Sequence, residues 1–493
     1  MSFHNQLVSS FINYPSGNAF CIKNNFYSYE KVSNLTNAIL QIINQYPDEQ
    51  RFGVIVSDDI ETYAAVIALL MAGKTYIPIH PHHPADRTEQ IIEQSGIGYI
   101  LTKPQEKTFP GVTTLNLIEA DLLENITESV TLSQFEPLDE NYAYILFTSG
   151  STGIPKGVPI TYHNLDAFVS AFYALGYDLN EKDHFLQMFD LTFDLSVMSY
   201  LIPLCLGACV YTIPDSGTKF THVYGVLEEH NITCALMVPS IINYLRPYFA
   251  EISLPEMRYS LFCGEALLKD VVGEWQSCVP NAIIENVYGP TEATIFCLTY
   301  RFNHPIEDYN GIVTIGKPMM DMESIIVDET SKPVQEGDKG ELCLYGPQLT
   351  PGYLNADKTR EAFFELDGKR YYRTGDIAYQ TDNGNFMYCG RVDHQVKIQG
   401  FRVELSEVEF HLRNISGMGN VVALAITNPN GLNQIDAVFE EEPANMEAIM
   451  TELKIKVPSY MIPSRVHFIS PLPLNANGKT DRKALQKTIT HQS

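Results

Sequence analysis

Short apolar runs alternate with amphipathic stretches through the first third of the chain. Runs of this kind predict buried strands, and periodic stretches of ten residues or so predict helices. The predicted strands are 54–56, 76–79, 98–102 and 142–147, and the predicted helices are 62–71 and 87–94. Residues 19–46 begin like a strand and turn helical at Tyr29. Strands that alternate with helices indicate a parallel sheet with crossover helices.

The alternation resumes after a polar stretch at 103–140, which we expect to form a connection or an edge hairpin. The segments that follow are 185–189, 196–206, 209–213, 223–230 and 233–237, a helix at 239–249, a strand at 259–263, a helix at 269–276 and a strand at 282–288. A second αβ-layered region is therefore predicted.

Beyond Thr299 short alternating strands with Gly and Pro turns predict a β-rich subdomain that ends near Arg391, and from His394 strands and helices form an α+β unit. The expected fold class is α/β. A large N-terminal domain, 1–391, combines parallel αβ-layered sheets with the small β-rich subdomain. A small C-terminal α+β domain, 392–493, completes the chain.

The net charge of the chain limits the classes of partner that we expect it to bind. The chain has 33 basic and 59 acidic residues among 493, a net charge of −26, which disfavours binding to nucleic acid or to anionic membranes. Nine scattered cysteines without a Cys-x-x-Cys pair indicate reduced, buried thiols. No signal peptide and no apolar run of membrane-spanning length is recognisable, so we expect a cytoplasmic protein without membrane insertion.

Residues 147–157, Phe-Thr-Ser-Gly-Ser-Thr-Gly-Ile-Pro-Lys-Gly, stand out chemically. Three glycines allow a turn with inward N–H groups that hold phosphate oxygens, and Lys156 adds a positive charge. The spacing is not that of a Walker A loop. The alternative interpretation, a flexible surface loop, is less favoured because further motifs follow along the chain.

The ordered motifs carry a family resemblance. They are Leu-Met-Ala-Gly-Lys-Thr-Tyr-Ile-Pro at 70–78, the loop at 148–157, Phe-Asp-Leu-Ser at 193–196, Asn-Val-Tyr-Gly-Pro-Thr-Glu at 286–292, 346–354, Tyr-Arg-Thr-Gly-Asp at 372–376, 390–409, Pro-Ser-Tyr-Met-Ile-Pro at 458–463 and Asn-Gly-Lys at 477–479. With them the chain resembles the adenylate-forming superfamily of acyl-CoA synthetases, luciferase and nonribosomal peptide synthetase adenylation domains. The runs at 190–198 and 262–265 are most similar to freestanding D-alanine–carrier protein ligases and single-domain amino-acid adenylation enzymes.

The resemblance implies a nucleotide site. Its ATP-binding residues are Thr148, Ser149, Gly150, Ser151, Thr152, Gly153, Lys156, Gly264, Glu265, Asn286, Val287, Tyr288, Gly289, Pro290, Thr291, Asp376, Tyr388, Cys389, Gly390, Arg391 and Lys479. Lys479 is the implied catalytic lysine between the substrate carboxylate and the α-phosphate, Glu292 the implied Mg²⁺ ligand, and Asp393 the implied hinge of a mobile C-terminal domain. The residue types suit the chemistry, because attack of a carboxylate on the α-phosphate needs positioning and charge neutralisation.

Asp194 matches the aspartate that pairs with the substrate ammonium in amino-acid-activating relatives. The other lining positions implied are Leu195, Met198, Leu236, Leu261, Cys263, Val287, Ile295 and Phe296. All are apolar or nearly so, which favours a small aliphatic amino acid. An aryl- or fatty-acyl-activating enzyme would leave the Asp194 carboxylate unpaired, at a high energetic cost.

Two features depart from the D-alanine ligase pattern, His80 in place of an aspartate and Ser-Tyr-Leu-Ile at 199–202. They leave D-alanine itself open, although not adenylation. His-Pro-His-His-Pro at 80–84 also suggests a metal site, but Asp86 is the one nearby acid in the sequence and the prolines indicate a stiff turn.

The function that we expect is ATP- and Mg²⁺-dependent formation of an aminoacyl-AMP from D-alanine or a similar small amino acid. Transfer of the aminoacyl group to the phosphopantetheine thiol of a separate carrier protein would follow. The alternatives are a carboxylate–CoA ligase, a nonribosomal-peptide-type enzyme for another small or cyclic aliphatic amino acid, and an inactive nucleotide-binding scaffold.

Overall fold

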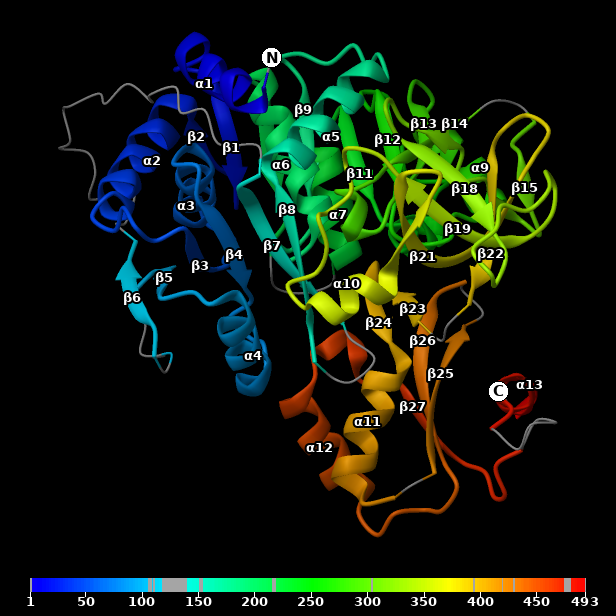
Figure 1. The fold of residues 1–493 in the computed structure, drawn as a ribbon. Helices are drawn as coiled ribbons and strands as arrows, with labels where there is room; N and C mark the ends of the chain where they lie inside the picture. The colour runs from blue at the N-terminus through cyan, green and yellow to red at the C-terminus, as the bar shows by residue number, and fades with distance from the viewer. Residues whose placement is uncertain are drawn as a thin grey trace. The chain divides into compact units, whose positions relative to one another are not determined.

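The apolar segments of the first 300 residues form two large, mainly parallel sheets (Figure 1). The computed structural model describes residues 2–104, 109, 111–117, 140–149, 154–214, 219–302, 305–392, 395–418, 420–428, 431–473 and 480–492. Within these residues the α/β prediction is confirmed.

One sheet has six strands. Their order is β6 (Thr113–Asn116), β5 (Tyr99–Thr102), β3 (Arg51–Ile55), β4 (Thr75–Ile79), β7 (Tyr142–Thr148) and β8 (Lys156–Thr161). Strand β6 lies in the polar stretch for which we expected a connection or an edge hairpin. It pairs in parallel with β5, so this part of the stretch is not a hairpin.

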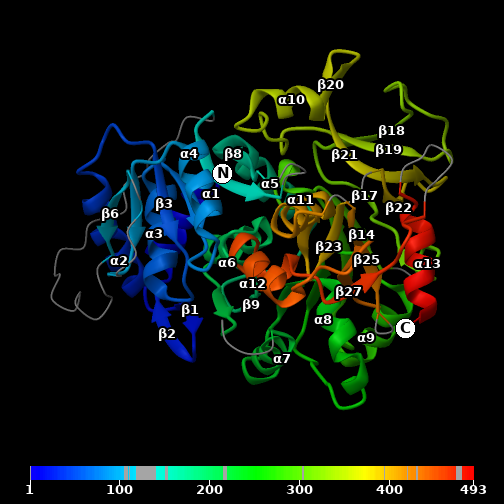
Figure 2. The ribbon, with the colours of Figure 1, turned by 90° about the horizontal axis from the view of Figure 1, so that it is seen from below.

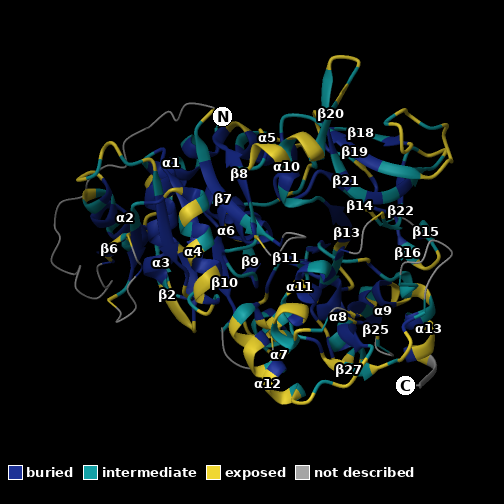
Figure 3. Cartoon of the chain, turned by 60° about the horizontal axis from the view of Figure 1, so that its bottom comes forward, coloured by how far each residue is buried: buried dark blue, intermediate teal, exposed yellow. Residues whose placement is uncertain are grey.

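The second sheet has nine strands, of which the six from β13 to β1 are parallel to one another. The order is β17 (Lys317–Pro318), β14 (Leu298–Arg301), β13 (Ile283–Tyr288), β12 (Tyr259–Phe262), β11 (Cys234–Met237), β9 (His184–Gln187), β10 (Cys209–Thr212), β1 (Asn18–Ile22) and β2 (Asn25–Ser28). The parallel strands are buried along most of their length (Figure 3).

Helices cover both sheets. They are α1 (Phe3–Asn13), α2 (Tyr29–Ile43), α3 (Ile60–Met71), α4 (Ala85–Ser95), α5 (Tyr162–Ala174), α6 (Asp194–Leu206), α7 (Lys219–Glu229), α8 (Pro239–Leu245) and α9 (Lys269–Cys278), with a 3-10 turn at Arg246–Tyr248. Helices α2 and α3 pack against each other, α2 beside β1 and α3 beside β3 and β4 (Figure 2). Every residue of α3 is buried, and Asp59 caps its start by accepting a hydrogen bond from the Thr62 N–H at 2.8 Å.

The region after Thr299 is rich in strands, as predicted. Its elements are β15 (Asp308–Tyr309), β16 (Ile312–Val313), β18 (Glu323–Val327), β19 (Gly340–Tyr345), α10 (Ala356–Ala362), β20 (Phe363–Leu366), β21 (Lys369–Gln380) and β22 (Phe386–Arg391). Strands β18, β19, β21, β20 and β22 form an antiparallel sheet with its own apolar core.

The C-terminal hundred residues have separate apolar clusters. Their elements are β23 (Gln395–Ile398), β24 (Phe401–Glu404), α11 (Leu405–Ser416), β25 (Val421–Thr427), β26 (Asn433–Phe439), α12 (Met446–Lys456), a 3-10 turn at Ser459–Met461, β27 (Arg465–Phe468) and α13 (Arg482–Gln492).

The chain divides into two compact units. The first comprises 1–81, 92–147 and 157–392, and the second 82–91, 148–156 and 393–493. Two segments from the first third of the sequence therefore group with the C-terminal residues. The assignment of 392–493 as a mobile lid over a substrate-binding core stays a prediction.

All nine cysteines lie within the described residues and none forms a disulfide, and all except Cys389 are buried. Among the described residues, no helix has both the length and the apolar character needed to span a bilayer.

Candidate functional site

Asp376 lies in β21 directly opposite Arg391 of β22. The Tyr288 hydroxyl donates to Asp376 Oδ2, and Arg391 Nη1 donates to Oδ1 at 2.6 Å. Burial, and next the Asp376 carboxylate, raise the pKa of Tyr288 well above its usual range, so this hydroxyl stays a donor. Two donors thus orient a buried carboxylate whose remaining lone pairs can accept hydrogen bonds from paired hydroxyl groups such as those of ribose.

Asn286 lies two residues before Tyr288 in β13, and its amide group is already partly used. Nδ2 donates to the carbonyl oxygens of Val313 and Thr314 at 3.4 and 2.9 Å. These bonds fix the orientation of the side chain and leave Oδ1 as an acceptor. An exocyclic amino group such as that of adenine donates hydrogen bonds and therefore requires such an acceptor.

The turn after β13 brings the nucleotide motif and the amino-acid motif into contact. A Cβ atom at Gly289 would lie 2.4 Å from the Phe296 Cα, so only glycine fits here. Beyond it, Thr294 and Ile295 have φ angles of 53° and 76°. Positive φ is strained for β-branched residues, and such strain persists where surrounding contacts enforce it. The Thr294 hydroxyl donates to the Gln348 carbonyl at 2.5 Å, which is one such contact.

Glu292 is fully buried in the 3-10 turn Thr291–Ala293. The Tyr353 hydroxyl donates to its Oε1 at 2.5 Å, and the Thr350 N–H donates to its carbonyl oxygen at 2.8 Å. A buried carboxylate held by a neutral donor fits Mg²⁺, which takes one or two protein carboxylates and completes its shell with phosphates and water. Tyr353 was not among the predicted site residues, although it lies in the 346–354 motif.

The predicted amino-acid pocket draws on one helix and three neighbouring strands. Asp194 is the first residue of α6 and is buried, and α6 also supplies Leu195 and Met198. Leu236 of β11 lies beside Leu261 of β12 in the sheet register. The members from the strands and the turns after them are Leu236, Leu261, Cys263, Val287, Ile295 and Phe296, all at most 2% exposed. Except for the Asp194 carboxylate and the Cys263 thiol, these side chains are hydrocarbon or thioether.

Two aromatic residues near the pocket were not predicted from the sequence. Phe168 of α5 meets the Phe296 ring edge to face, with centroids 5.1 Å apart, and so fixes that ring. Tyr144 of β7 is fully buried, and its hydroxyl makes no hydrogen bond with any residue that the structure describes. Burial, and next the Asp194 charge, raise the pKa of Tyr144, so a neutral hydroxyl stands within the electrostatic reach of Asp194.

Part of the phosphate loop falls within the described residues. Ser149 Oγ donates to the Arg402 carbonyl at 2.7 Å, and Lys156 Nζ lies 3.5 Å from Glu404 Oε1, which also accepts from Gln395 Nε2 at 2.9 Å. All of these residues belong to the second unit. Lys156 therefore has a carboxylate partner that a triphosphate would have to replace. The predicted residues Gly150, Ser151, Thr152, Gly153, Asp393 and Lys479 lie outside the described residues.

Other predicted residues have structural partners. Glu265 Oε2 accepts from the Ser240 N–H at 2.8 Å, at the start of α8. Tyr388, Cys389 and Gly390 lie in β22 beside Arg391. Within the described part of the chain, which includes the histidines at 80–84, there is no group of three or more His, Cys, Asp or Glu placed to hold a metal.

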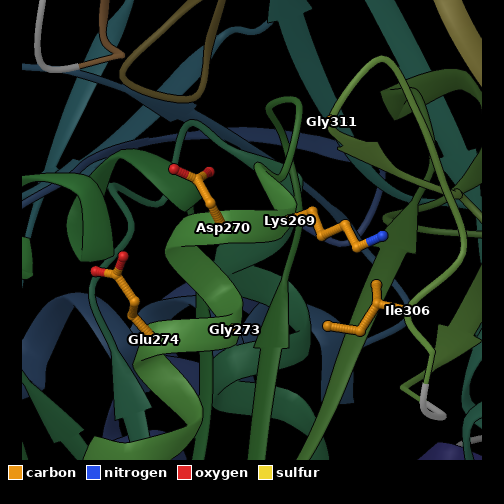
Figure 4. Close-up of a pocket in the computed structure, with 6 residues that line it drawn as sticks. All are labelled: Lys269, Asp270, Gly273, Glu274, Ile306 and Gly311. Atoms are coloured by element: carbon orange, nitrogen blue, oxygen red, sulfur yellow. The ribbon is translucent and has the colours of Figure 1, made fainter.

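A surface hollow of about 590 Å³ lies apart from these residues, lined by Lys269, Asp270, Gly273, Glu274, Ile306 and Gly311 (Figure 4). Asp270 and Glu274 project from the same flank of α9, and both pair with Arg246, at 2.9 and 2.6 Å. The two acidic groups thus share one guanidinium, which compensates one of their two negative charges.

Comparisons with known proteins identify the family of the chain. The AMP-binding enzyme family matches residues 13–354. A D-alanine–D-alanyl carrier protein ligase of Bacillus cereus (strain B4264) is 33% identical over 497 residues, covering 97% of both chains. One from Bacillus anthracis is 32% identical over 509 residues, covering 99% of this chain and all of the relative.

Solved structures give the same fold. The Vibrio cholerae adenylation domain AlmE in complex with glycyl-adenosine-5'-phosphate superposes with a TM-score of 0.87 at 27% identity, covering 99% of this chain and 98% of that one. Holo-PA1221, with adenylation and PCP domains, has a TM-score of 0.84 at 24% identity over 99% of this chain and 84% of that one, and shows the fold alone. The chain belongs to the AMP-binding enzyme family and is an adenylate-forming ligase with a nucleotide-binding site.

Proposed function

We propose that this enzyme activates a small amino acid, glycine or alanine of either hand, as its adenylate and passes it to the phosphopantetheine thiol of a carrier protein. The observation that carries the proposal is Asp194, a buried carboxylate at the start of α6 among apolar side chains. A carboxylate at the edge of an apolar pocket is a suitable partner for the ammonium group of an amino-acid substrate.

The size and polarity of the pocket support a small substrate. Met198, Ile295 and Phe296 are almost fully buried, and the Phe296 ring is held in place by Phe168. None of these side chains offers a hydrogen bond to a polar side chain, whose burial without a partner costs about 1–3 kcal/mol. The names of the relatives support the same class, since one group is named for D-alanine and the Vibrio domain binds a glycyl adenylate.

Adenylation joins one oxygen of the amino-acid carboxylate to the α-phosphorus of ATP and breaks the bond between the α- and β-phosphates. Asp376, oriented by Tyr288 and Arg391, accepts the ribose hydroxyls, and Asn286 Oδ1 accepts from the adenine amino group. Lys479 neutralises the charge that develops between the carboxylate and the α-phosphate, which is most effective where the donor is preorganised. Mg²⁺ bound at Glu292 supplies charge neutralisation on the phosphates when it is present.

Transfer then joins the thiol sulfur of the carrier to the acyl carbon and breaks the bond from that carbon to the phosphate oxygen. AMP leaves and the thiol proton is released. We propose that rotation of the C-terminal domain at Asp393 separates the two steps, because one site then serves two reactions with different charge requirements.

The test has two parts. Amino-acid-dependent exchange of labelled pyrophosphate into ATP is measured with glycine, the L-amino acids and their D-forms. Acceptors are then compared by mass spectrometry, with a phosphopantetheine-bearing D-alanyl carrier protein against free coenzyme A. Exchange with glycine or alanine and loading of the carrier are expected. Exchange only with carboxylates that lack an ammonium, or transfer only to coenzyme A, would contradict the proposal and favour a carboxylate–CoA ligase.

A further inference from the structure

His80, the residue that departs from the D-alanine ligase pattern, has a specific partner. It follows β4 of the six-stranded sheet, and its Nε2 lies 3.2 Å from Oδ2 of Asp190. Asp190 belongs to the connection between β9 of the nine-stranded sheet and α6. The pair therefore joins the two sheets at the carboxyl ends of two parallel strands, within the first unit.

Asp190 also closes the turn that leads into α6. Its Oδ1 accepts from the Thr192 N–H at 2.7 Å and from the Thr192 hydroxyl at 2.5 Å, and its carbonyl accepts from the Phe193 N–H at 3.0 Å. The N-cap residue of α6 is Phe193, which makes no side-chain cap hydrogen bond. The first residue of the helix is Asp194, so the position of its carboxylate depends on the turn that Asp190 organises.

We propose that His80 is a positioning residue for amino-acid recognition. By holding one oxygen of Asp190 it fixes the turn that presents Asp194 to the substrate ammonium, while the other oxygen of Asp190 fixes the turn internally. The inference rests on the proposed function and adds a residue to the amino-acid side of the site, outside the nucleotide contacts.

The exposure of the pair distinguishes this role from a contribution to stability. The His80 and Asp190 side chains are 32% and 26% exposed, and pairs that reach solvent add little to global stability. A small displacement of a group that contacts the substrate nevertheless has a large kinetic effect. The expected signature is thus a change in amino-acid KM without a change in ATP KM or in the thermal midpoint.

The test replaces His80 in two ways. His80→Glu places a second carboxylate of greater reach against Asp190, and we expect the amino-acid KM in pyrophosphate exchange to rise about tenfold, with the ATP KM within about twofold of wild type. His80→Gln keeps an N–H donor of similar reach, and we expect it to stay within about threefold of wild type. His163→Asp, which adds the same charge at an exposed position of α5, is the control and should change neither constant.

A second substitution provides a rescue that general damage to the fold would not give. Asp190→Asn in the His80→Glu background retains an oxygen for Thr192 and gains an amide donor toward position 80, so the amino-acid KM should recover to within about threefold of wild type. An unchanged amino-acid KM in His80→Glu, equal increases in both constants, or failure of the rescue would each overturn the inference. Absence of exchange by the wild-type enzyme with every amino acid would instead contradict the proposed function.

Discussion

The Tyr353 hydroxyl donates a hydrogen bond to the fully buried carboxylate of Glu292, with 2.5 Å between the oxygens. A hydrogen bond to an ionised, buried group is among the stronger ones in proteins, since loss of the donor leaves the charge poorly solvated. Tyr353 therefore holds in place the carboxylate to which we assign Mg²⁺.

Tyr353→Phe removes this donor, together with a longer hydrogen bond of 3.4 Å between the Tyr353 and Tyr372 hydroxyls. We expect the free energy of unfolding to fall by about 1–3 kcal/mol and the Mg²⁺ concentration for half-maximal pyrophosphate exchange to rise several-fold. Chemical denaturation and a Mg²⁺ titration at saturating ATP measure the two effects. Tyr248→Phe, at an exposed position, is the control. An unaltered Mg²⁺ titration in the Tyr353→Phe enzyme would show that Glu292 is not part of the metal site.

Lys479→Ala should lower amino-acid-dependent pyrophosphate exchange by roughly a hundredfold or more, if it resembles the loss of one preorganised charge donor. ATP affinity should change little, because the adenine and ribose contacts that we assign involve Asn286 and Asp376. Equilibrium binding of a nonhydrolysable ATP analogue checks the second point. Lys487→Ala, an exposed position of α13, is the matched control. Full activity of Lys479→Ala would end the assignment of this lysine as catalytic.

Asp393→Pro should separate the two half-reactions. Proline fixes φ and removes a backbone donor at the position where rotation is expected. Pyrophosphate exchange should be largely retained and loading of the carrier lost, as measured on the same preparation. Equal loss of both activities would show damage to the fold, and equal retention would show that the hinge lies elsewhere.

His4 gives a pH dependence of stability. It is buried in α1, 2% exposed, and burial holds its pKa below the usual value of 6.5, so the folded protein keeps it neutral. In the unfolded chain it binds a proton below about pH 6.5. Unfolding therefore takes up a proton, and stability falls as the pH drops below that value, by at most about 1.4 kcal/mol per pH unit from this residue.

His4→Leu should remove that part of the slope. The free energy of unfolding, measured by urea titration between pH 7.5 and 5, should vary less in the variant than in the wild type. His163→Leu, at an exposed position, should leave the slope as it is. A wild-type slope that His4→Leu does not reduce would show that other groups dominate acid sensitivity.

The parallel strands were predictable because burial on both faces makes them continuous apolar runs, as at β4 and β11. Helices α1 and α5 and strands β6 and β8 were not predicted. Strand β6 is four residues with three exposed, so its sequence lacks an apolar run. Its pairing with β5 is set by the sheet and not by its own residues.

The sequence motifs supplied most of the residues that we assign to the site, but they did not indicate which of these residues interact with each other. Asp376 and Arg391 were each assigned to the nucleotide, and the structure adds that they bind each other together with Tyr288. Pairs such as His80 with Asp190 and Lys156 with Glu404 join segments far apart in the chain. Neither pair lies within a single sheet, so each is a tertiary contact that periodicity does not encode.

Specificity gives the last prediction. Among the described residues that we assign to the pocket, the polar groups are the Asp194 carboxylate and the Cys263 thiol, so glycine or alanine should exceed aspartate, lysine and glutamine by at least roughly tenfold in kcat/KM. Asp194→Ala should lower kcat/KM for all amino acids together, because it removes the partner of the ammonium that they share.

Cys263 is fully buried directly after β12 and is our candidate for the contact with the substrate Cα. Cys263→Ala should therefore bring the kcat/KM values of D- and L-alanine closer together without changing ATP affinity. Cys278→Ala, another buried thiol, at the end of α9, is the matched control. A wild-type preference for a charged or large aromatic amino acid would show that the pocket residues are wrongly placed, and an unchanged D/L ratio in Cys263→Ala would move the stereochemical contact elsewhere.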